Sequence, residues 1–256
     1  MSTLSLAARD SATMLRRNLR HALRYPSMSL STAAMPIIFM LLFVYVFGST
    51  LGAGIGGADY VDYVAPGIIL MTAAAGAIST AVSVCVDMTE GIVARFRTMA
   101  ISRVSLLTGH VVGSLIQTMF GMALVIGVAV LIGFRPSAGP VAWVEATGVL
   151  LMLTLALTWL AVAFGLVARR PETASNLPLP LTLLPFLGSG FVPTDSMPAG
   201  VRQFAEYQPF TPLTETLRGL LMGTPIGHHG LIAVAWCAAI ALGGYLWAKR
   251  LFNRAG

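Results

Sequence analysis

A short charged segment between two long apolar runs is the feature that most limits how this chain can fold. Asp87–His110 reads DMTEGIVARFRTMAISRVSLLTGH, whereas residues 71–86 before it and 111–134 after it contain no charged side chain. An arginine at the centre of a bilayer costs about 2.5–3.5 kcal/mol. If the two apolar runs cross a membrane, the charged segment between them must therefore lie outside the hydrocarbon.

The composition places the chain among the integral membrane proteins. Hydrophobic residues make up 56% of its 256 residues and charged residues only 10%, against about 25% charged in an ordinary soluble domain. A chain of this length has room for about six helices of ~20 residues, the length that a bilayer requires. We therefore predict an all-α membrane protein whose six transmembrane helices lie at approximately residues 30–51, 66–86, 107–133, 141–168, 177–192 and 231–248.

Three further helical segments complete the predicted domain, which takes in residues 1–256. Residues 4–26 have basic side chains opposite an apolar stripe, as in an amphipathic helix that lies in the membrane interface. Residues 87–106 should form a cytoplasmic helix between the second and third spans. Residues 194–226 are too polar and proline-rich to span, yet their leucines recur at helical spacing, so we expect a re-entrant external segment before the last span.

The cations indicate the orientation of the chain. With both termini, the charged segment and Arg169-Arg170 on one side, that side holds all but three of the 16 Lys and Arg residues. Cytoplasmic loops of membrane proteins carry the excess of Lys and Arg, so both termini should be cytoplasmic. Because the cations are spread over several loops rather than one face, a nucleic-acid partner is not expected. The three exceptions are Arg135, Arg202 and Arg218.

No motif in the chain would let it drive transport by itself. The phosphate-binding pattern GxxxxGK(S/T) is absent, and no Asp, Glu, Lys or Arg falls at the middle of a predicted span, where ion-coupled transporters commonly place one. Cys85 and Cys237 have no zinc or redox spacing, and His228-His229 lies in a Gly-rich turn. We therefore expect no catalytic residue, metal or cofactor on this chain, and the energy for uphill transport must come from another polypeptide.

The charged segment has the pattern of a docking helix. Three apolar positions at i, i+3 and i+7 share one helical face, and the arginines lie off that face. Spacing alone leaves open a solvated basic loop that only sets the topology. The apolar positions are Val93, Phe96 and Ala100, and the arginines are Arg95, Arg97 and Arg103.

Two apolar regions could line a path for an apolar substrate. Phe39, Phe43 and Phe47 recur at i, i+4 and i+8, although such a stripe could equally face lipid or pack against another helix. The run 177–192 is interrupted by three prolines and two glycines. Irregular backbone at membrane depth is tolerated where it is buried in protein or lines a cavity.

The layout as a whole resembles the permease subunit of type-2 ABC transporters, and within that family the daunorubicin-resistance branch of bacterial exporters. The most specific stretch is Glu90-Gly91 followed by RFRTMAISR at residues 95–103, which is similar to the coupling-helix pattern of the family. A second match is PFTPLT at residues 209–214 with RGLL at residues 218–221, similar to the external segment before the last span. Family patterns often carry Leu-Leu where this chain has Arg97-Thr98.

The resemblance implies a multi-pass protein of the bacterial cell membrane that works in drug efflux. Two permease copies, expected to be a homodimer, or one copy with a homologue, would bind two copies of a cytosolic ABC ATPase, and ATP and Mg²⁺ would be held by that ATPase. Membrane lipids would surround the assembly. The residues expected to couple to the ATPase are Glu90, Gly91, Arg95, Phe96, Arg97, Met99, Ile101 and Arg103.

The same resemblance suggests a substrate path at the interface between permease copies, close to the first, second and fifth spans. A path without fixed charge suits an amphipathic or apolar compound such as a drug, polyketide or lipid. The alternatives are a lipid or glycan flippase of the same fold and a membrane scaffold or immunity protein that transports nothing. The expected path residues are Phe39, Phe43, Phe47, Met71, Thr72, Phe186 and Phe191, and the external motif residues are Pro209, Pro212 and Arg218.

Overall fold

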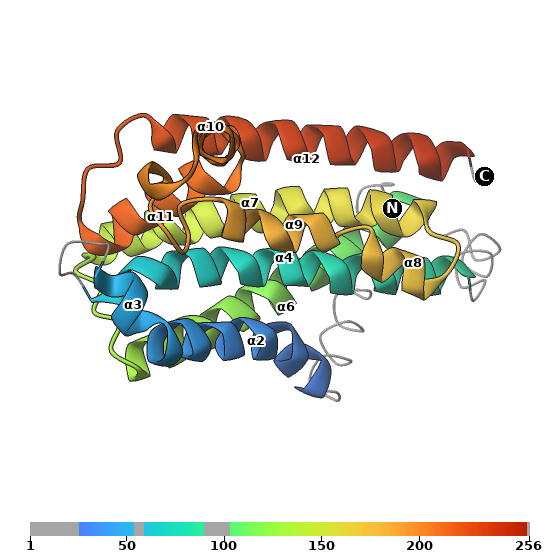
Figure 1. Ribbon diagram of the computed structural model, residues 1–256. Helices are drawn as coiled ribbons and strands as arrows, with labels where there is room; N and C mark the ends of the chain where they lie inside the picture. Colours follow the sequence, from blue (N-terminus) through green and yellow to red (C-terminus); the bar gives the residue numbers. More distant parts are fainter. Residues whose placement is uncertain (1–25, 54–58, 90–102, 255–256) are drawn as a thin grey trace.

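The computed structural model describes residues 26–53, 59–89 and 103–254, and every secondary-structure element in these ranges is helical (Figure 1). The predicted all-α class is therefore confirmed for the described part of the chain. The α-helices are α2 (Pro26–Leu41), α3 (Gly48–Gly52), α4 (Tyr60–Thr89), α6 (Arg103–Leu131), α7 (Pro140–Val167), α8 (Pro171–Asn176), α9 (Leu179–Leu183), α10 (Ala199–Tyr207), α11 (Phe210–Met222) and α12 (His229–Arg254). The other elements are a π-helix, η1 (Leu42–Val46), and two 3₁₀ turns, η3 (Leu184–Leu187) and η4 (Thr194–Ser196).

Four of the described helices are long and apolar enough to cross a membrane. They are Tyr60–Thr89, Gly109–Leu131, Pro140–Val167 and His229–Asn253, which correspond to the second, third, fourth and sixth predicted spans. The first predicted span contains a shorter apolar helix, Thr32–Val46. The predicted interfacial helix at residues 4–26 lies outside the described residues, apart from Pro26, which is the first residue of α2.

α4 is the central helix of the bundle and contacts α2, α6, α7, α8 and α11 (Figure 1). It begins at Tyr60 rather than near Pro66, because the side chains of its first turns are buried and continue its packed face. Small side chains fill its middle, as the composition of this run predicts, and let neighbouring backbones approach closely. A Cβ added to Gly165 of α7, for example, would lie 2.6 Å from the carbonyl oxygen of Ala81.

The fifth apolar run forms a series of short helices rather than one continuous helix. Pro178 caps α9, Pro180 lies in its first turn and Pro185 lies in η3. Each proline lacks an amide donor, so the hydrogen-bond ladder is interrupted at short intervals. The turn that follows packs tightly on α4, since a Cβ added to Gly67 would lie 2.7 Å from the carbonyl oxygen of Gly190.

The segment between the fifth and sixth runs contains the helical element that its leucines predict. Leu213, Leu217, Leu220 and Leu221 of α11 are all buried, and α11 packs on α4, α7 and α12. α11 ends at Gly223, whose φ of +69° is the left-handed conformation that closes many helices. The compact helix pair α10–α11 therefore covers one end of the bundle (Figure 1).

The described cations lie at opposite ends of the bundle, as the predicted orientation requires. Near the start of α4, the amide of Arg135 donates to Asp62 Oδ1 at 2.9 Å, and Arg218 bonds the carbonyl of Tyr63. At the other end, Ala168, which precedes Arg169-Arg170, accepts a contact from Cys85 Sγ at 3.4 Å. The C-terminal part of α12, which carries Lys249 and Arg250, packs there through Ala248.

The contact between Gly67 and Gly190 gives the first prediction. Gly67→Ala should lower the free energy of unfolding by about 1–3 kcal/mol, because the new methyl group meets backbone that cannot rotate away. Thermal unfolding in detergent, followed with a thiol-reactive dye, measures this because Cys85 and Cys237 are buried and free. Gly127→Ala is the matched control, since nothing lies within 4 Å of its added Cβ. Equal unfolding midpoints for the two variants would contradict the prediction.

Candidate functional site

Most of the residues predicted to couple to an ATPase lie outside the described residues. α4 runs through Thr89 and α6 begins at Arg103, so the predicted helix at 87–106 overlaps both of them and leaves residues 90–102 between. Arg103 is the first residue of α6, and its side chain is not described. The coupling role therefore stays a prediction for Glu90, Gly91, Arg95, Phe96, Arg97, Met99, Ile101 and Arg103.

The two ends of the predicted coupling segment are described, and they are joined by an ion pair. His110 Nε2 of α6 lies 2.9 Å from Asp87 Oδ2 of α4, and the two side chains are only 8% and 15% exposed. Val84 and Val111, near the two residues in the sequence, pack together with Val162 of α7. Asp87 near the end of α4 and His110 of α6 are therefore in contact next to an apolar cluster that joins three helices.

This pairing was not predicted from the sequence, where Asp87 and His110 served only as the bounds of the charged segment. The available signal was that each is an ionisable residue at the membrane-adjacent end of a long apolar run. Desolvated charges in such positions are usually paired.

The phenylalanines of the two predicted path regions contact one another. Phe186 stacks on Phe191 with ring centroids 4.4 Å apart, and Phe43 lies 4.6 Å from Phe191. Phe39 meets Phe186 edge-on at 5.4 Å, and Phe47 lies 5.7 Å from Phe43. We call these five rings the aromatic cluster. It joins the first and fifth apolar runs, which are far apart in the sequence.

The start of α4 supports the aromatic cluster. The Tyr60 hydroxyl donates to the carbonyl oxygen of Phe191 at 3.1 Å, and Gly67 packs on Gly190 just before it. The remaining predicted path residues, Met71 and Thr72, are buried where α4 packs against its neighbours. Met71 is 6% exposed, and Thr72 is fully buried with its methyl group towards Gly121 of α6.

Arg218 of the predicted external motif connects three parts of the chain. Its guanidinium donates to the carbonyl oxygens of Tyr63 at 3.0 Å and Ser189 at 2.8 Å. It also pairs with Glu215 at 2.6 Å and lies 3.9 Å from the centroid of the Tyr63 ring. The side chain is only 13% exposed. Arg218 thus fixes α11 against α4 and against the turn that precedes Phe191.

The two prolines of the external motif start α11. Pro209 occupies the N-cap position, and Pro212 lies in the first turn, where helix amides have no partner in the ladder and proline is tolerated. Gln208 completes the cap, because its Oε1 accepts a hydrogen bond from the amide of Phe210 at 2.9 Å. The motif therefore positions Arg218.

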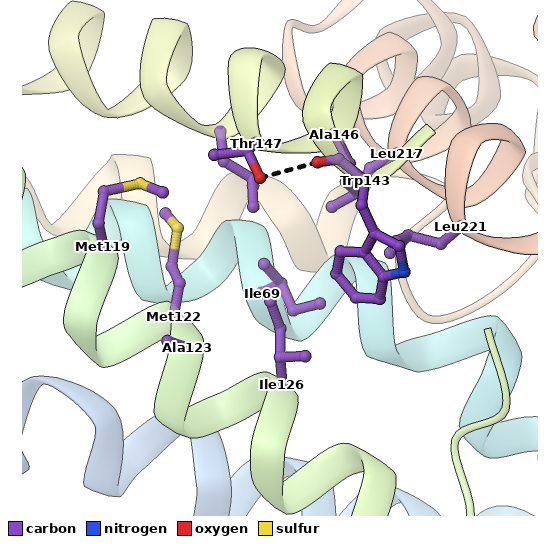
Figure 2. Close-up of a pocket in the computed structure, with 11 residues that line it drawn as sticks. Ile69, Met119, Met122, Ala123, Ile126, Trp143, Ala146, Thr147, Leu217 and Leu221 are labelled. Atoms are coloured by element: carbon purple, nitrogen blue, oxygen red, sulfur yellow. Dashed lines mark hydrogen bonds between the residues drawn. The ribbon is translucent and has the colours of Figure 1, made fainter. Parts of the chain in front are cut away.

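An apolar cavity of about 130 Å³ lies between α4, α6, α7 and α11 (Figure 2). Its one hydroxyl, on Thr147, donates back to the carbonyl of Trp143 at 2.8 Å, and the rest of the lining is mainly apolar. It shares no residue with the aromatic cluster. Among the described residues, no group of three or more His, Cys, Asp or Glu side chains could hold a metal ion. The lining residues are Ile69, Met119, Met122, Ala123, Ile126, Trp143, Ala146, Thr147, Leu150, Leu217 and Leu221.

Residues 10–222 match the ABC-2 type transporter family over most of the chain. The chain belongs to the ABC-2 type transporter family. The resemblance to type-2 ABC permeases is thereby confirmed. The match includes the coupling segment, the aromatic cluster and Arg218, and it ends before α12.

Relatives of this chain are named as permeases of drug-resistance ABC transporters. It is 27% identical over 202 residues to the daunorubicin resistance ABC transporter permease protein DrrB1 of Streptomyces coeruleorubidus, covering 78% of this chain and 70% of the relative. It is 24% identical over 208 residues to the probable doxorubicin resistance ABC transporter permease protein DrrC of Mycobacterium tuberculosis, covering 81% of this chain and 75% of the relative.

The contrast between two arginines near the same end of the bundle gives the second prediction. Arg218→Ala should lower the free energy of unfolding by about 1.5–3 kcal/mol, because two part-buried carbonyls lose a charged donor. Arg218→Lys should restore only part of this loss, since Nη2 bonds both carbonyls while Nη1 pairs with Glu215, and an ammonium has no second nitrogen in such a planar fork. Dye-monitored thermal unfolding measures both variants.

Arg202 provides the matched control for this prediction. Its side chain is 45% exposed and pairs with Asp195 and Glu206 on the surface. The hydrogen bond to Glu206, with the negative charge of Asp195, raises the pKa of Arg202. Arg202→Ala should leave the unfolding midpoint near that of the unmodified protein, because exposed pairs contribute little. A loss as large as that of Arg218→Ala would refute the role given to Arg218.

Proposed function

We propose that this chain is the membrane permease subunit of an ATP-driven exporter of apolar or amphipathic compounds. The observation that carries the proposal is membership of the ABC-2 type transporter family over residues 10–222. Relatives named for daunorubicin and doxorubicin resistance support a drug-like cargo. The chain has no phosphate-binding loop, so ATP and Mg²⁺ would be bound by a separate ATPase and the complex would be the translocase.

The proposed topology has six membrane crossings. To the four long apolar helices it adds the first run, where α2 and η1 together cover Pro26–Val46 and would extend about 30 Å at helical rise. It also adds the broken run from α8 to η3. The division of cations between the two ends supports cytoplasmic termini, a cytoplasmic coupling helix at 87–106 and an external segment at 194–226.

The proposed assembly contains two permease copies and two ATPases. One side of α2 and η1 is strongly exposed and apolar, which fits contact with lipid or with a second copy. ATP-driven closure of the ATPases would move the coupling helices and change access between the copies. The side chains that are more than half exposed on α2 and η1 are Met35, Ile38, Tyr45 and Val46.

The aromatic cluster is the proposed wall of the cargo path. Its rings are uncharged and offer faces and edges for stacking. It lies where the proline-broken fifth run meets the π-helical end of the first run, so neither wall is a regular α-helix. π-helical turns are frequent at functional sites. This arrangement supports a path for aromatic or apolar cargo.

Copurification tests the partner. Expressed with its ATPase, the permease should retain it, and Phe96→Asp should abolish retention because a charge replaces an apolar docking contact. Phe204→Asp is the matched control, since Phe204 is an exposed phenylalanine of α10 near the other end of the bundle. Retention of the ATPase by Phe96→Asp would remove the coupling assignment. Failure of the unmodified chain to bind an ATPase would favour the non-transporting scaffold.

Cargo-stimulated ATP hydrolysis in reconstituted vesicles tests the path. Phe43→Ala should reduce stimulation by daunorubicin by about tenfold, the loss expected from about 1.4 kcal/mol of stacking. Phe120→Ala is the control, because Phe120 is a half-exposed phenylalanine of α6 outside the cluster. Equal stimulation in the two variants would exclude the aromatic cluster from the path. Stimulation by lipids or glycans but not by daunorubicin would favour the flippase alternative.

A further inference from the structure

We propose that the Asp87–His110 ion pair is a latch that holds the two ends of the coupling segment together, so that α4 and α6 move as one unit when the ATPase moves that segment. The two residues are positioning residues. The inference rests on the proposed function, because it assigns the place where motion from the partner enters the membrane bundle.

The location of the pair supports this role. Asp87 lies in the last turn of α4, and His110 lies two turns into α6, so the pair joins the two helices that flank residues 90–102. His110 Nε2 and Asp87 Oδ2 are 2.9 Å apart, and both side chains are largely buried. The contact fixes the position of α4 relative to α6 next to residues 90–102.

A buried ion pair is a poor choice if only stability is needed. Removing two charges from water costs free energy that their attraction offsets only in part, and apolar residues of similar size often stabilise as well or better. Val84 and Val111, which lie near the pair in the sequence, belong to an apolar cluster with Val162 of α7. Apolar contacts can slide, whereas the attraction between an acidic and an imidazole side chain falls as the two groups move apart. An ion pair at this position therefore fits a need for fixed alignment.

α4 carries the effect of the latch to the aromatic cluster. From Asp87 to Tyr60 the helix extends about 40 Å at helical rise. At its far end, Tyr60 donates to the carbonyl of Phe191 and Gly67 contacts Gly190. Along its length α4 is packed on α6, where Gly76 meets Thr118. A displacement at the latch is therefore transmitted to the cluster by packed backbone.

The experiment uses the complete transporter, permease with its ATPase, in vesicles. Asp87→Ala and His110→Ala should each leave the ATPase bound and the basal hydrolysis rate near that of the unmodified complex. Stimulation by daunorubicin should fall by about fivefold or more, the lower range of typical coupling between sites. The double variant should lose no more than either single variant, because both changes remove the same contact.

Two further variants separate a latch from a merely structural role. Asp87→Glu, which keeps the carboxylate, and the exchange Asp87→His with His110→Asp should recover stimulation, whereas Asp87→Asn should not. Unfolding midpoints are measured in parallel, and the exposed pair of Asp195 and Arg202 provides an Asp195→Ala control. If stimulation follows the midpoint across all variants, with no separate dependence on the carboxylate, the latch is overturned.

The outcomes distinguish the latch from the function on which it rests. If the unmodified complex shows daunorubicin-stimulated hydrolysis and both alanine variants keep it, the latch is wrong and the export function stands. If the unmodified chain binds no ATPase and no cargo stimulates hydrolysis, the proposed function fails and the latch fails with it. If Asp87→Ala does not fold, the exchange and Asp87→Glu still decide the question, because each retains one carboxyl and one imidazole side chain.

Discussion

Close approach of helix backbones around α4 is the interaction on which the rest of the structure depends. In a bilayer, lipid chains are as apolar as leucine, so helices associate through packing rather than through escape from water. α4 meets this requirement with alanines and glycines. Thr118 of α6 and Gly165 of α7 pack closely against it. Because seven described α-helices contact α4, together with η1 and η3, its position determines where the aromatic cluster and the Asp87–His110 pair lie.

Polar contacts between segments are concentrated at the two ends of this packed core. At one end Arg218 binds the carbonyls of Tyr63 and Ser189, and at the other His110 meets Asp87. Between them, polar side chains such as Thr72, Thr80 and Thr158 bond a carbonyl one turn earlier in their own helix. The middle can therefore adjust by small shifts in packing, while each end has a defined alignment. This division suits a transporter whose partner acts at one end.

The sequence was sufficient to predict the helical class, four of the membrane helices and the interruption of the fifth run, because apolar length and proline act locally. It also predicted a helical element from the leucine spacing of residues 213–221, and the structure shows that these leucines are buried. Contacts between distant segments were harder to foresee. The phenylalanines at 39–47 and at 186–191 were each recognised as possible path residues, but nothing in their spacing indicated that they meet. Likewise, the bounds of α4 depended on the burial of Tyr60 and Val61, which comes from tertiary packing.

The π-helical turn at Leu42–Val46 explains how three phenylalanines stay on one side of a helix. In an α-helix of 3.6 residues per turn, a step of four passes a full turn, so a stripe at every fourth position drifts around the axis. A π-turn holds more residues, and the same step falls short of a full turn. The step from Phe39 to Phe43 runs mostly through α2, and the step from Phe43 to Phe47 runs through η1, so the two drifts oppose each other. The local change in the number of residues per turn thus keeps the three phenylalanines aligned on the side that Phe186 and Phe191 face. The spacing of these phenylalanines in the sequence does not by itself predict this alignment.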